Sequence, residues 1–200
     1  MFDSKLLFLD RIENKIDLFC RMSEIELFIK AFRKTRKFTE IIPHLKSDER
    51  FRTALFCEIE SNQYPFPEYS SWISIHYYNQ YPEDLTVEWV EKSVNIILTT
   101  SNHSVQRNLV CVLAQTPISL TENASFLDRL LFFIMDPEAL PALKLYSIKA
   151  VEFHFIPTYP ELIRELKSIF ELLVNNPKRS IQMMCRDFHK KHKHHAYYHS

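Results

Sequence analysis

The sequence predicts an all-α fold assembled from antiparallel helix pairs, and three observations support this prediction. No glycine occurs in 200 residues, apolar side chains recur at helical spacing almost everywhere, and prolines and asparagines fall in short breaks between the apolar stretches. Without glycine, a chain cannot build the usual phosphate-binding, dinucleotide-binding or calcium-binding loops. β-Hairpins also rely on glycine for positive φ angles, so all-β folds are disfavoured. With 46% hydrophobic residues, the chain can bury one sizeable core.

The first third of the chain is expected to form helices that end at a pair of prolines. A helix is predicted to open at Ser47, and Pro65 and Pro67 break it because prolines remove backbone donors and disfavour helical geometry before them. We interpret residues 1–65 as a divergent helical cap within a single domain spanning residues 1–200. Its apolar stripes consist of Leu6, Leu7, Leu9, Ile12, Ile16 and Phe19, and of Ile25, Leu27, Phe28 and Phe32.

From residue 66 onwards the helices repeat in pairs. Val105, Ala142 and Ile181 each open the helix that follows a short break, and they lie 37 and 39 positions apart. A helix-pair repeat near forty residues is typical of a HEAT-like solenoid. The alternative is a non-repetitive bundle of helices of similar length. The expected helices cover residues 69–81, 85–100, 104–115, 125–135, 141–155, 159–174 and 180–192, with asparagines and prolines ending them in place of glycine.

These repeats carry strings that resemble a known family. The strings are YPEDL at 81–85, SVQRNL at 104–109, ALKLYSIKA at 142–150 and YPEL at 159–162. In this order they resemble short HEAT-like proteins of Bacteroidota, which automatic transfer often labels adenylosuccinate lyase. The resemblance covers about residues 66–192 and implies a bacterial armadillo-type α-α superhelix. A His-rich tail follows at residues 193–200.

The family label also implies a lyase as an alternative activity. Lyases of that superfamily resemble one another in a glycine-containing loop that bears a catalytic serine, and the present sequence holds no such string. A β-elimination needs a base and an acid across a cleft. His76, His103 and His154 are scattered along the helices without a partner pattern. We therefore predict no catalytic residues and a scaffold rather than an enzyme, with the lyase as the alternative.

Charge differs between the two helices of each expected pair. The first helices carry a net negative charge, whereas the second helices carry a net positive charge that is largest in the last one. Second helices of HEAT-like solenoids line the concave face, so the pattern predicts a basic concave face that attracts an anionic partner. The alternative is that these are ordinary solvated charges. The candidate binding residues are Arg107, Lys144, Lys149, Lys178, Arg179, Arg186 and Lys190.

These observations predict a non-enzymatic scaffold that binds a protein or another anionic partner. Nucleic-acid binding, as in HEAT-like DNA-repair proteins, is the weaker alternative because 25 basic residues balance 25 acidic ones. Charged residues interrupt the N-terminal apolar run, no apolar run is long enough to span a membrane, and the four cysteines lie far apart. We therefore expect a cytoplasmic protein with reduced thiols, no membrane association and no cofactor.

Two further groups of side chains have competing interpretations. Cys185, His189 and His192 lie at i, i+4 and i+7 on one helix face, which makes them weak metal candidates. No second ligand pair accompanies them and lysines surround them, so no essential metal is predicted. An aromatic cluster that includes Trp72 and Tyr77 could form a recognition patch, but helical spacing favours a core that seals the N-terminal cap onto the repeats.

Overall fold

The structure, a computed structural model, describes residues 20–34, 40–61 and 63–199. Within these ranges the regular elements are all helical, which confirms the predicted all-α class. The chain divides into two compact units between Asp84 and Leu85. The predicted stripe from Leu6 to Phe19 lies outside the described residues, and the proposed cap over residues 1–65 stays a prediction.

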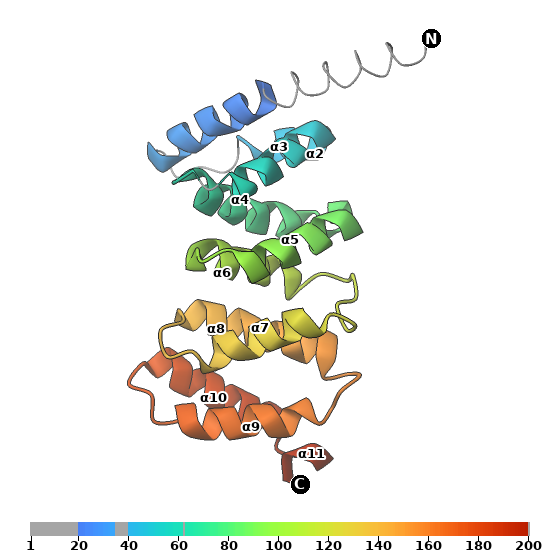
Figure 1. Ribbon diagram of the computed structural model, residues 1–200, viewed down its shortest axis with the longest axis vertical. Helices are drawn as coiled ribbons and strands as arrows, with labels where there is room; N and C mark the ends of the chain where they lie inside the picture. The colour runs from blue at the N-terminus through green and yellow to red at the C-terminus, as the bar shows by residue number, and fades with distance from the viewer. Residues whose placement is uncertain (1–19, 35–39, 62, 200) are drawn as a thin grey trace. The chain divides into compact units, whose positions relative to one another are not determined.

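The first unit contains a helix over residues 20–34 and three labelled helices. These are α2 (Ile42–Ser47), α3 (Glu49–Glu60) and α4 (Phe66–Gln80), followed by a single 3₁₀ turn, η1 (Pro82–Asp84) (Figure 1). Asp48 caps α3 by accepting a hydrogen bond from the backbone amide of Arg50. The two prolines stand at the start of α4, where the first helical turn needs no intrahelical donors.

Aromatic side chains hold the first unit together. Phe32 packs edge-on against Tyr69 and Trp72, with ring centroids 5.8 Å and 5.3 Å apart. Tyr77 and Tyr78 on α4 are buried. Trp72, Tyr69 and Tyr81 are half-buried, and Tyr64 is 78% exposed. Only Tyr77 and Tyr78 of the predicted aromatic cluster therefore belong to the core, and the sealing of the cap onto the repeats stays a prediction.

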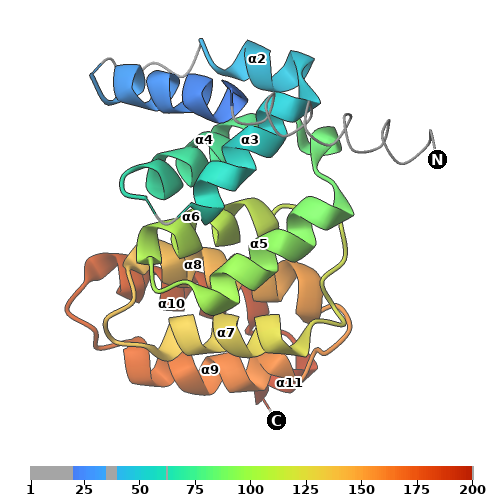
Figure 2. The same ribbon diagram turned by 45° about the horizontal axis from the view of Figure 1, so that its top comes forward.

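The second unit is built from three antiparallel helix pairs and a terminal turn. The first helices of the pairs form one layer and the second helices form another, as Figures 1 and 2 show. The pairs are α5 (Val87–Thr99) with α6 (His103–Leu113), α7 (Ala124–Met135) with α8 (Pro141–Ala150), and α9 (Leu162–Leu173) with α10 (Arg179–His192). A π-helical turn, η2 (Val151–Phe155), extends α8, and α11 (Ala196–His199) closes the described chain.

Two asparagines in this unit begin helices. The Asn102 carboxamide accepts hydrogen bonds from the amides of Ser104 and Val105, and Asn123 accepts one from the amide of Phe126. Both asparagines have negative φ angles, −79° and −94°, so neither adopts the left-handed conformation that a helix C-terminus favours. Asn102 and Asn123 are thus N-caps, whereas Asn176 lies in the break before α10, whose N-cap is Lys178.

Helices α8 and α10 lie side by side and run in the same direction. Near their C-terminal ends, Glu152 contacts both Lys191 and His192. Near their N-terminal ends, Lys144 and Lys178 are close enough for their charges to interact. Glu152 thus contacts residues 39 and 40 positions later in the chain, which is close to the repeat length in the sequence.

Candidate partner-binding face

Lys144, one of the predicted binding residues, is fully buried and belongs to the core. Its Nζ donates hydrogen bonds to the carbonyl oxygens of Ile134 (2.8 Å), Phe133 (3.3 Å) and Asp136. These carbonyls belong to the last turn of α7 and the residue after it, so the ammonium group caps that helix where its dipole is negative. Burial lowers the pKa of Lys144. This burial removes Lys144 from the candidate face.

The other predicted residues are accessible. Lys149, Lys178, Arg179, Arg186 and Lys190 are exposed, and Arg107 is half-buried. Among the described residues, none of the five exposed cations has a carboxylate within salt-bridge distance. By contrast, Lys92 on α5 pairs with Glu88 at 2.7 Å.

The exposed side of α8 continues onto the exposed side of α10. On α8, Leu145, Lys149 and Phe153 recur every four residues, and on α10 Met183 and Lys190 recur two turns apart. The buried sides of both helices contact the first-helix layer, so these exposed sides point away from it. We call this surface the second-helix face and define it by Arg107, Leu145, Lys149, Phe153, Met183 and Lys190.

Arg107 and Lys149 approach one another around Tyr146. Tyr146 hydrogen-bonds the thiol of Cys111, and both cations interact electrostatically with that thiol. The Lys149 Nζ lies 5.8 Å from the centre of the Tyr146 ring, within the range of a cation–π contact. Burial nevertheless raises the pKa of Cys111, so its thiol is protonated and unreactive. The structure thus brings together two of the predicted cations from different helices.

Sequence reasoning missed the apolar members of this face. Phe153 is 54% exposed, Met183 is 51% exposed and Leu145 is 38% exposed. The signal for them is in the sequence: in the predicted helix over residues 141–155, Leu145, Lys149 and Phe153 recur every four residues and share one side, but a charge count considers only the lysine.

The weak metal candidates each have a different neighbour. The Nδ1 of His189 lies 2.6 Å from the Tyr198 hydroxyl, and the Nε2 of His192 lies 2.7 Å from Glu152 Oε1. Cys185 is buried, and this burial raises the pKa of its thiol. Within the described part of the chain, no three His, Cys, Asp or Glu side chains are grouped so as to hold a metal ion.

The histidines of the lyase alternative also lie apart on separate elements. His154 is buried in η2, where its Nε2 lies 2.8 Å from the carbonyl oxygen of Leu113 and burial lowers its pKa. His76 is exposed on α4, with its ring 5.7 Å from Trp72, and His103 is exposed at the start of α6.

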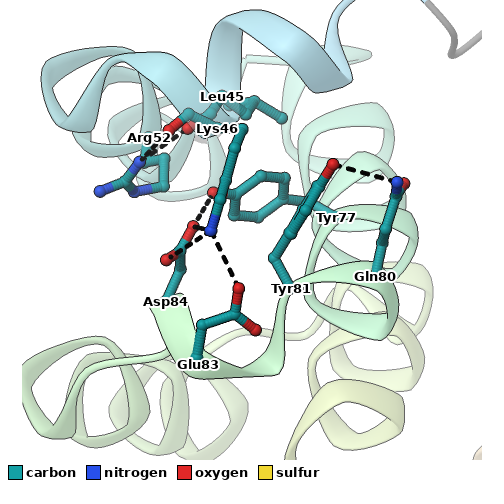
Figure 3. A network of polar contacts seen from close by, with 8 residues as sticks. All are labelled: Leu45, Lys46, Arg52, Tyr77, Gln80, Tyr81, Glu83 and Asp84. Atoms are coloured by element: carbon teal, nitrogen blue, oxygen red, sulfur yellow. Dashed lines mark hydrogen bonds and ion pairs between the residues drawn. The ribbon is translucent and has the colours of Figure 1, made fainter.

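A polar network in the first unit pairs Lys46 with the acidic residues Glu83 and Asp84. Lys46 donates to Glu83 Oε1 (2.9 Å) and Asp84 Oδ1 (3.1 Å), and the Tyr77 hydroxyl donates to Asp84 (Figure 3). The Lys46 ammonium also lies 4.5 Å from the centre of the Tyr81 ring. Two carboxylates thus neutralise this lysine, and the network joins α2 to the end of α4.

The comparison with known families agrees with this architecture. A family model described as HEAT repeat domain matches residues 29–192. The chain belongs to the HEAT repeat domain family. No curated protein and no solved structure matches the sequence. As a HEAT repeat protein it is a helical repeat scaffold, and among the described residues no helix has the length and apolar character needed to cross a bilayer.

Proposed function

We propose that this HEAT repeat protein is a non-enzymatic scaffold that binds an acidic protein segment on its second-helix face. The observation that carries the proposal is the set of exposed cations on α8 and α10 that lack carboxylate partners among the described residues. Lys149 and Lys190 are exposed on neighbouring helices of one layer. An acidic partner supplies the missing negative charges, and such pairing increases the association rate and the specificity of binding.

The composition of the face favours protein over nucleic acid. Exposed Phe153, Met183 and Leu145 lie among the cations. Aromatic residues, methionine and arginine are enriched in protein–protein interfaces, whereas nucleic-acid interfaces are more polar and far more positively charged. The net charge of the chain is zero, which does not favour a nucleic-acid backbone as the partner.

Fluorescence anisotropy with labelled polyglutamate tests the proposal. The wild-type protein is expected to bind at low salt and to lose affinity as the salt concentration rises. Reversing both charges, with Lys149→Glu and Lys190→Glu, should weaken binding by about tenfold or more. Arg164→Glu on α9 is the matched control, because Arg164 is an exposed cation of the first-helix layer. Its affinity for polyglutamate should match that of the wild type.

Two outcomes contradict the proposal. One is no binding of polyglutamate at low salt, and the other is an equal loss of affinity in the Arg164→Glu control. Labelled duplex DNA and single-stranded RNA serve as competing probes. Tighter binding of either nucleic acid than of polyglutamate would favour the nucleic-acid alternative.

A further inference from the structure

We propose that the partner segment is amphipathic, with two apolar side chains that contact the second-helix face at Leu145 and Phe153 and acidic side chains that contact Lys149 and Lys190. This inference rests on the proposed function and specifies the chemistry of the partner. It follows from the backbone of η2, from the alignment of α8 with α10, and from the alternation of apolar and basic groups along both helices.

Phe153 lies in the π-helical turn and is exposed, whereas its neighbours in η2, Val151, His154 and Phe155, are all buried. It follows Leu145 and Lys149 at four-residue spacing, so it lies on the exposed side of the helix. π-Turns within helices occur frequently at functional sites. An aromatic ring held out in this way is the type of group that anchors a protein partner.

The alignment of the two helices places similar groups level with one another. Because Glu152 lies beside Lys191, a residue of α8 is level with the residue thirty-nine positions later on α10. By this offset Leu145 is level with Met184, the buried neighbour of the exposed Met183, and Val151 at the start of the π-helical turn is level with Lys190. Along the second-helix face, Leu145 and Met183 therefore lie at one end, Phe153 and Lys190 lie at the other end, and Lys149 lies between them.

The spacing of the anchors sets the spacing expected in the partner. Leu145 and Phe153 are eight positions apart, which is about 12 Å along a helix axis. A helical segment that lies along α8 reaches both anchors with apolar residues seven or eight positions apart. Carboxylates between those two residues would then face Lys149. On α10, the flexible Met183 side chain can rearrange to pack against one of the partner's two apolar residues.

Two labelled peptides of equal length and equal net charge test this inference. Both contain glutamates on a helical frame, one has two leucines eight positions apart, and the other has glutamines at those positions. The peptide with leucines should bind the wild-type protein at least about tenfold more tightly, because two apolar side chains become buried. In a protein with Leu145→Ser and Phe153→Ser, this preference should disappear while binding of polyglutamate remains.

The control variant is Leu172→Ser on α9, which removes an 84% exposed apolar side chain from the first-helix layer. It should keep the preference for the leucine peptide. Thermal melting of all three proteins checks that each is folded. Equal affinity for the two peptides would overturn this inference and leave the proposed scaffold function intact. An equal loss of preference in Leu172→Ser would also overturn it. If neither the peptides nor polyglutamate bind, the proposed function itself fails.

Discussion

The two sides of α8 use the same residue type for opposite purposes. Lys144 faces inward and its ammonium caps α7 through three carbonyl oxygens, whereas Lys149, five positions later, faces outward without a carboxylate partner among the described residues. This difference shows that counting the charges along a helix does not separate buried side chains from exposed ones. Only the outward side can bind a partner, and the inward side determines whether the helix pair is stable.

The largest expected change in the free energy of unfolding comes from replacing the inward-facing Lys144. Lys144→Met keeps an unbranched apolar stem but leaves three carbonyl oxygens of α7 without their donor. Breaking such a buried charged contact should lower the free energy of unfolding by about 3 kcal/mol. Chemical denaturation of the full chain measures this value. A loss below about 0.5 kcal/mol, the usual range for a surface substitution, would contradict the role assigned to Lys144.

A smaller effect is expected from an inward polar group of the first unit. Tyr77→Phe removes the hydroxyl that donates to Asp84 but keeps the buried ring. The free energy of unfolding should fall by about 1 kcal/mol, which is the typical net contribution of one hydrogen bond. Lys46→Met is the comparison variant. It should lower the free energy of unfolding by less than Tyr77→Phe does, because the ion pairs of Lys46 are solvent-exposed. Denaturant titrations of both variants give the order.

A pH effect is expected from the inward carboxyl of Glu58. Its side chain is buried, and this burial together with the nearby charge of Glu26 raises the pKa of Glu58 above the ordinary value for a glutamate. Between the ordinary pKa and the raised one, the folded state binds the proton and the unfolded state does not. Stability should therefore fall as the pH rises through that window.

Glu58→Gln provides the test of this pH effect, because the amide cannot titrate. Denaturation across the acidic range should show a shallower decline of stability with rising pH in the variant than in the wild type. Identical slopes in the two proteins would show that Glu58 titrates normally in the folded state.

The smallest effect on stability is expected from the outward lysine. Lys149→Met should change the free energy of unfolding by no more than about 0.5 kcal/mol, because the side chain is exposed and its one aromatic contact is at the edge of the usual range. Chemical denaturation beside Lys144→Met makes the comparison direct. Similar losses in the two variants would remove the distinction between the two sides of α8.

The sequence was sufficient to predict the helices and their pairing, because apolar periodicity and proline breaks are local signals. The expected helices at 125–135 and 180–192 differ from α7 and α10 by one residue each at their starts. The burial of Lys144 also left a signal, since Ile148 and Val151 follow it at i+4 and i+7 on the buried side. A charge count disregards that pattern.

Other features depended on contacts that periodicity does not encode. The pairing of Lys46 with Glu83 and Asp84 joins residues 37 and 38 positions apart. The π-helical form of η2 has no counterpart in the apolar periodicity of residues 141–155. The sequence predicts asparagines at helix ends because they tolerate the left-handed conformation, but the carboxamides of Asn102 and Asn123 cap the following helices.

The most direct test of the central claim is the salt dependence of polyglutamate binding to the wild type and to the variant with Lys149→Glu and Lys190→Glu. If the outward cations of α8 and α10 bind an acidic segment, affinity for the wild type falls steeply with salt, and the variant binds at least about tenfold more weakly at low salt with a shallower dependence. Equal affinities with equal salt dependence in the two proteins would contradict the claim.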